Sequence, residues 1–115
     1  MSHLSILPTV YSNVDLLEAS LRDEGFNVVV GGLMARFGRD PLLVDLLAKF
    51  GDSPSLGWII GSDGVLTMVG ALQRIARHHG LEGRLQRVAR RYAVRSALDA
   101  AEQFTPGTQM MLESS

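Results

Sequence analysis

Residues 73–104, QRIARHHGLEGRLQRVARRYAVRSALDAAEQF, decide the fold that we predict for this chain. This is the only long stretch with helical periodicity and good helix formers, so it predicts a long helical unit. The segments before it are short, apolar and separated by Gly, Pro, Asp and Ser, as is typical of strands. The stretch also holds seven of the eleven cationic side chains, which are the candidate interaction residues: Arg74, Arg77, Arg84, Arg87, Arg90, Arg91 and Arg95.

The apolar residues of this helical unit lie on two opposite faces. At 100° per residue, one group consists of Leu81, Leu85, Val88 and Tyr92. The other group consists of Val94, Ala97, Leu98, Ala101 and Phe104. The apolar face therefore changes near Tyr92–Val94, and either the chain bends there or one helix is buried on alternate sides. In both cases we expect Leu85, Val88, Tyr92 and Leu98 to be largely buried.

The first 25 residues predict a strand and then a helix. Leu4, Ile6 and Val10 alternate with polar residues, and Pro8 near the end of this strand indicates a sheet edge, because proline cannot donate to a ladder. Residues 13–24 predict an amphipathic helix that Gly25 ends. Ser12 and Asp15 have the spacing of a capping box, which makes Ser12 the expected cap.

The middle of the chain predicts consecutive strands with one ambiguous segment. Residues 26–37 predict a strand with a bulge or a turn at Gly31-Gly32. Residues 42–50 fit a helix that begins at Asp40-Pro41, and they also fit a strand with alternate apolar residues. After a turn at residues 51–54, two strand-like runs joined by residues 61–64 predict a hairpin. Within it Trp58 is expected to be a core or interface anchor, and Asp63 a turn residue.

At 115 residues the chain predicts one domain with one real core. We expect an α+β fold, in which an antiparallel sheet of about four to six strands packs with an N-terminal helix and the C-terminal arginine-rich helical unit. Residues 1–70 supply the strand–helix–strands part and residues 71–104 the helical unit. Residues 105–115 are a tail or an edge strand, with residues 109–112 as its candidate.

The composition argues against several kinds of chemistry. The chain has no cysteine, so disulfides, thiolate metal sites and a cysteine nucleophile are excluded. His78 and His79 are adjacent and cannot chelate one ion from the same helix face, and no metal or triad motif is present. We therefore predict a protein that is not an enzyme, with no catalytic residue, cofactor or metal. No membrane span or secretory signal is recognisable, so we expect a cytoplasmic protein that does not insert into a membrane.

Four short motifs occur in order along the chain: MSHLS at the start, LGW with SDG in the hairpin, ARRYAV in the helical unit, and EQF at its end. In this arrangement, over roughly residues 1–104, the chain resembles an uncharacterised family of cyanobacteria and algal plastid genomes, a conserved plastid open reading frame of unknown function. The resemblance implies consecutive antiparallel strands over residues 37–69, and so it favours a strand for residues 42–50. It implies no activity, cofactor or catalytic residue.

The net charge of −1 conceals a strong asymmetry. Residues 74–95 carry seven arginines against Glu82, a balance of +6, and the rest of the chain has a balance of −7. The arginines can be a solvated face whose charges meet the protein's own acids, or a surface for an acidic protein partner or self-association. They can also bind nucleic acid or another anion, but the sequence pI of about 6.3 does not favour this. We predict a small accessory or interaction protein, with nucleic-acid binding through residues 74–95 as the alternative.

Overall fold

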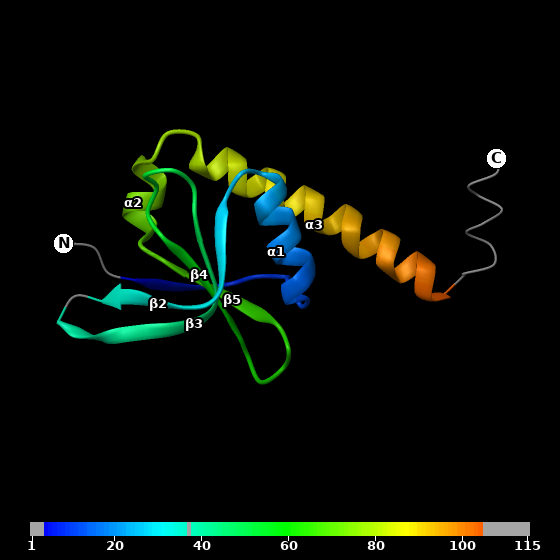
Figure 1. Ribbon diagram of the computed structural model, residues 1–115, viewed down its shortest axis with the longest axis horizontal. Coiled ribbons are helices and arrows are strands. Elements are labelled where there is room, and N and C mark those ends of the chain that lie inside the picture. Colours follow the sequence, from blue (N-terminus) through cyan, green and yellow to red (C-terminus); the bar gives the residue numbers. More distant parts are fainter. Residues whose placement is uncertain (1–3, 37, 105–115) are drawn as a thin grey trace.

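The computed structural model describes residues 4–36 and 38–104, and these residues form a five-stranded antiparallel sheet with helices packed on it (Figure 1). The strand order is β1-β5-β4-β3-β2. The elements in chain order are β1 (Ser5–Pro8), α1 (Val14–Asp23), β2 (Asn27–Arg36), β3 (Arg39–Lys49), β4 (Leu56–Ile60), β5 (Leu66–Gly70), α2 (Leu72–Arg77) and α3 (Leu81–Phe104). This confirms the predicted α+β class. β1 and its Pro8 lie at one edge of the sheet, as the proline indicates.

The predicted hairpin is formed by β4 and β5. Its turn is held by three hydrogen bonds. The Gly61 amide donates to the Val65 carbonyl at 2.9 Å, the Gly64 amide donates to the Gly61 carbonyl at 3.0 Å, and the Val65 amide donates to Asp63 Oδ1 at 3.0 Å. Asp63 is thus a turn residue, as predicted. Trp58 is 1% exposed and lies in the core between this hairpin and the helices.

Residues 42–50, where the local signals conflict, lie in strand β3 except for Phe50 at its end. β3 pairs with β2 along its length and with β4 through residues 46–48, and every second residue from Val44 to Ala48 is buried. Asp45 extends this pairing, because its Oδ2 accepts the Ile60 amide at 2.7 Å. The helix signal at Asp40-Pro41 is overridden because both sides of the strand gain partners. Pro41 lies beyond the residues paired with β4 and removes no hydrogen bond there.

The glycine pair in β2 makes neither a turn nor a shift in the strand pairing, so the predicted bulge or turn at Gly31-Gly32 was wrong. The strand continues through both glycines, with Val30 opposite Leu46 and Gly32 opposite Val44, and the register irregularity lies further on, between Met34 and Arg36. Gly31 has a φ of 70°, a conformation that a side chain would strain.

The apolar side chains of the β2–β3 hairpin join two different clusters on either side of Gly31. Val28 and Leu46 belong to the core beneath the helices, whereas Met34 and Val44 belong to a second cluster whose described members lie in or beside strands. A Cβ on Gly57 in β4 would stand 2.5 Å from the Met34 sulfur, so the hairpin packs directly on this backbone. The outer half of the β2–β3 hairpin therefore curls over the sheet face that the helices leave open.

Helix α1 begins one residue later than the capping prediction requires. Asn13 is its N-cap, since its side-chain Oδ1 accepts the Leu16 amide at 3.1 Å. The prediction of Ser12 was therefore wrong, and the reason is that Asn caps helices as well as Ser does. The predicted amphipathic helix and its end at Gly25 are confirmed, with Leu17 and Leu21 fully buried and Gly25 at a φ of 92°.

The helical unit is two helices, with the chain turning at residues 78–80 between α2 and α3. α1 and α3 lie together on one side of the sheet, and α3 is helical without interruption across Tyr92–Val94 (Figure 1). Its first apolar stripe is buried as predicted, with Val88 at 1% and Tyr92 at 6% exposure, and Leu85 is partly buried. The prediction for Leu98 was wrong, because this side chain is 62% exposed. The candidate strand at residues 109–112 lies outside the described residues.

Candidate interaction surfaces

Three of the candidate arginines lie around the buried carboxylate of Glu24. Glu24 follows α1, and its side chain is only 5% exposed. Arg87 Nε donates to Oε1 at 2.9 Å, Arg91 Nε donates to Oε2 at 2.6 Å, and Arg84 donates to the Glu24 carbonyl at 2.8 Å. The hydrogen bonds from Arg91 and then Arg87 lower the pKa of Glu24, so the carboxylate remains charged despite its burial. We call these four residues the Glu24 cluster.

The Glu24 cluster and its neighbours fasten α3 to α1. Arg95 donates to Asp23 Oδ2, one residue before Glu24. The Arg84 guanidinium lies 3.9 Å from the centre of the Phe50 ring, a cation–π contact. Four of the seven candidate arginines thus meet acids of the protein itself, which is the first of the three roles that the sequence leaves open.

The remaining candidates, Arg74, Arg77 and Arg90, are exposed and form no ion pair within residues 4–36 and 38–104. Arg74 and Arg77 lie on α2, and Arg90 lies on α3. The seven residues therefore divide into a paired group of four on α3 and three side chains that remain available to a ligand or partner.

Tyr92 makes a second connection between α3 and the start of α1. Its hydroxyl oxygen accepts the backbone amides of Ser12 at 3.0 Å and Asn13 at 3.1 Å. Its ring meets Tyr11 edge to face, with the ring centres 4.6 Å apart. Burial, with a smaller contribution from Tyr92, raises the pKa of Tyr11. The two hydrogen bonds to the Tyr92 hydroxyl therefore anchor α3 to the start of α1 as far as Tyr92.

From Ala93 to Ala101 the apolar residues of α3 are exposed. Val94 is 59% exposed and Leu98 is 62% exposed, and Ala97 and Ala101 on the same stripe are not buried either. Figure 1 shows that this part of α3 extends past α1 and the sheet. We call Val94, Ala97, Leu98 and Ala101 the apolar end of α3.

His78 lies at ion-pair distance from an acid. His78 Nε2 lies 3.2 Å from Asp52 Oδ1, and this contact lowers the pKa of Asp52. The described part of the chain contains no group of three or more side chains placed to hold a metal ion. No helix within residues 4–36 and 38–104 has both the length and the apolar character that crossing a membrane requires.

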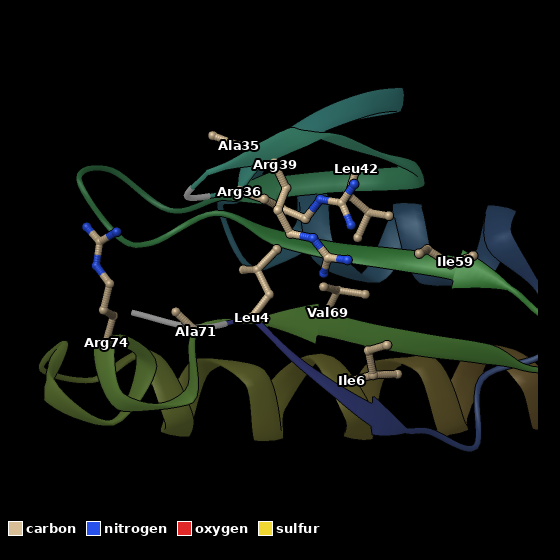
Figure 2. A pocket seen from close by; sticks show the side chains of 10 residues that line it. All are labelled: Leu4, Ile6, Ala35, Arg36, Arg39, Leu42, Ile59, Val69, Ala71 and Arg74. Carbon is tan, nitrogen blue, oxygen red and sulfur yellow. The ribbon is translucent and has the colours of Figure 1, made fainter. Parts of the chain in front are cut away.

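Two hollows open on opposite sides of the sheet. The larger, of about 350 Å³, lies where the β2–β3 hairpin curls over the open sheet face, and Arg36, Arg39 and Arg74 line it together with apolar side chains (Figure 2). The smaller, of about 290 Å³, lies between the β1–α1 connection and α3. Trp58 lines the smaller hollow, and its buried Nε1 donates to no group in the described structure.

Sequence reasoning missed Glu24, Arg36 and Arg39. In the sequence Glu24 is simply the last residue of a predicted helix. The only indication of its role is that it is an acid at a helix end, in a chain with a cluster of arginines far away in sequence. Arg36 and Arg39 lie 35 or more positions before Arg74, and the hairpin brings them to the same hollow. No local sequence pattern predicts that the hairpin curls in this way, because the curl depends on the close contact of the Met34 side chain with Gly57.

A scan against protein-family models finds no matching family, and searches of curated proteins and of solved structures find no match either.

Proposed function

We propose that the protein is a small non-enzymatic interaction protein that associates with a second copy of itself through the apolar end of α3, and so acts as a subunit of a larger assembly. The observation that supports this most is the exposure of Val94 and Leu98, at 59% and 62%, on a helix whose earlier apolar stripe is buried. Apolar residues at i, i+4 and i+7 form the kind of stripe that packs against another helix. Exposed apolar patches of this kind mark interaction sites.

A second copy in antiparallel orientation fits this stripe. α1 and the sheet lie beside the first part of α3, and the stripe lies beyond them (Figure 1). In an antiparallel pair the rest of the two copies therefore lies at opposite ends of the contact, whereas a parallel pair brings the two copies against each other at the same end. The small side chains of Ala97 and Ala101 allow the two helices to approach closely, and a two-fold pair uses the same patch twice.

The exposed edge of the sheet is the competing surface for self-association. β2 is an edge strand, and Val29, Val30 and Leu33 on it are more than half exposed. Gly31 interrupts its regular conformation with a positive φ, and such irregularities protect sheet edges from pairing with another chain. We therefore favour α3 over this edge.

Nucleic-acid binding through residues 74–95 is the second candidate function. Arg74, Arg77 and Arg90 support it, because they are exposed and make no ion pair within the described residues. The charge available is much smaller than the sequence suggests, since Arg84, Arg87 and Arg91 share Glu24. Neutralised arginines contribute little to the counterion release that drives binding to phosphates.

The self-association proposal is tested by the solution mass of matched variants. Leu98→Asp and Leu33→Asp replace side chains of equal exposure, one on α3 and one on the β2 edge. We expect light scattering after gel filtration to give twice the 12.5-kDa chain mass for the wild type and for Leu33→Asp, and the single mass for Leu98→Asp. A monomeric wild type, or a dimer that only Leu33→Asp disrupts, overturns the proposal.

A further inference from the structure

The larger hollow combines an apolar lining with an excess of positive charge. It lies between the curled β2–β3 hairpin and the open face of the sheet, far from the apolar end of α3. Val69 is fully buried, Leu42 and Ile59 are partly buried, and all three belong to the cluster beneath the hairpin. The volume of about 350 Å³ is within the range of small-molecule sites.

Three guanidinium groups line this hollow, and no carboxylate of the described residues does. Arg36 uses Nε to donate to the Asp40 carbonyl at 2.7 Å. Within residues 4–36 and 38–104, neither Arg36 nor Arg39 nor Arg74 lies within ion-pair distance of an acid. This differs sharply from α3, where the Glu24 cluster gives the arginines a carboxylate. Like charges gathered at an apolar surface repel each other, and an anion placed among them relieves that repulsion.

The arrangement of the side chains separates a charged part from an apolar part. Figure 2 shows Arg36 and Arg39 reaching from the hairpin over Leu42 and toward Val69, while Arg74 stands apart at the end near α2. The two hairpin arginines are therefore placed to act together on one anionic group. Arginine suits this role because its planar fork matches the oxygens of a carboxylate or phosphate.

We propose that this hollow binds a small amphiphilic anion, with its carboxylate or phosphate held by Arg36 and Arg39 and its apolar body lying against Ile6, Leu42 and Ile59. A bare inorganic anion would leave the apolar surface in contact with water. A neutral apolar molecule would leave the guanidinium groups without a partner. A ligand with both parts satisfies the charge and the apolar surface together, and such convergence of a few polar groups on an apolar pocket is typical of ligand sites. This inference is independent of self-association through α3.

A purely structural role for the same arginines predicts a different outcome. Arginine stems cover apolar surface while their charged ends remain in water, and in that case the hollow has no preference for any anion. The two roles differ in a measurable way, since only the binding site requires the charged and apolar parts of one molecule at the same time.

The test is isothermal titration calorimetry of the full chain with sodium decanoate below its micelle concentration, with decanol and inorganic phosphate as separate titrants. We expect saturable binding of one decanoate per chain, and affinities at least tenfold lower for decanol and for phosphate. Dodecyl phosphate then reports whether the charged group must be a carboxylate. Phosphate that binds as well as decanoate, decanol that does so, or decanoate that does not saturate overturns the proposal.

Matched variants test whether the binding occurs in this hollow. Arg39→Gln removes a lining charge from an exposed residue, and Arg77→Gln removes an exposed charge from α2 outside the hollow. Ile6→Ser removes a lining apolar group that is 70% exposed, so the fold is expected to tolerate it. We expect Arg39→Gln and Ile6→Ser each to weaken decanoate binding at least fivefold, with Arg77→Gln unchanged. Equal weakening by Arg39→Gln and Arg77→Gln would indicate diffuse attraction and would contradict the site.

Discussion

Replacing the buried carboxylate of the Glu24 cluster should destabilise the fold through a charge effect that can be measured. Glu24→Gln keeps the size of the side chain and removes the charge that Arg87 and Arg91 contact at 2.9 and 2.6 Å. Breaking a buried ion pair by removing one partner costs about 3–5 kcal/mol. Here the arginines left behind are 46% and 49% exposed and can return to water, which reduces that cost. We expect Glu24→Gln to lower the free energy of unfolding by about 2–3 kcal/mol.

Urea denaturation followed by circular dichroism measures this change. A loss of that size moves the unfolding midpoint by roughly 1–2 M urea for a domain of this length. Glu18→Gln is the matched control, because Glu18 makes an i,i+4 pair with Arg22 that should contribute at most about 0.5 kcal/mol. If Glu24→Gln behaves like Glu18→Gln, the Glu24 cluster does not hold α3 to α1 and the reasoning fails.

The same variant has a defined dependence on pH. Ion pairing lowers the pKa of Glu24 in the folded protein, so the unfolded chain takes up this proton first as the pH falls. The stabilisation is complete above the ordinary glutamate pKa of about 4.3 and is lost as the pH falls through the lower folded value. The difference between wild type and Glu24→Gln should therefore be constant near neutral pH and shrink in acid. A difference that grows on acidification would contradict the sign of the pKa shift.

Three further expectations concern the core, the anchor of α1 and nucleic acid. Leu17→Ala should lower the free energy of unfolding by about 2–5 kcal/mol, because Leu17 is fully buried. Leu98→Ala should change it by no more than about 0.5 kcal/mol at concentrations where the chain is monomeric, because Leu98 is exposed. Equal losses of stability in thermal denaturation would contradict the burial pattern. Tyr92→Phe should cost about 1–2 kcal/mol and speed hydrogen exchange of the Ser12 and Asn13 amides, which lose their acceptor; unchanged exchange would show that the hydroxyl is not their partner. Fluorescence titration with duplex and single-stranded DNA at physiological salt should give no appreciable binding, because the Glu24 cluster neutralises arginines of α3; sub-micromolar binding with a steep salt dependence would favour the alternative function.

Much of the fold could be predicted from local patterns in the sequence. The turn residues between β4 and β5, the apolar stripe of α1 and the first stripe of α3 each report a structure that a few neighbouring residues decide. The strand at residues 42–50 could be predicted only with the help of the family resemblance. Its own residues favour a helix slightly, and its conformation is decided by partners on both sides.

The errors have a common physical cause. The spacing of apolar residues shows which face of a helix they share, but it does not show whether another element packs against that face. Val94 and Leu98 have the spacing of buried residues, but α1 and the sheet do not reach them. The hollow beneath the hairpin was missed for the related reason that Arg36 and Arg39 reach the same hollow as Arg74 only because the outer half of the β2–β3 hairpin curls over the sheet. From the sequence it was possible that the arginines pair with acids of the same protein, but Glu24 could not be identified as the acid.

The central proposal, that two copies associate through antiparallel α3 helices, is tested most directly by a single introduced thiol. The chain has no cysteine of its own, so Ala97→Cys places the only thiol near the centre of the apolar end of α3. An antiparallel pair centred there brings the introduced thiol of each copy close to that of the other, and mild oxidation should convert most of the protein to a disulfide-linked dimer. In the control Gln86→Cys, on the same helix, the two thiols would be about 35 Å apart at 1.5 Å per residue, so this variant should remain uncrosslinked. Efficient crosslinking of Ala97→Cys alone is the predicted result. Equal crosslinking of both variants, or of neither, would contradict the account.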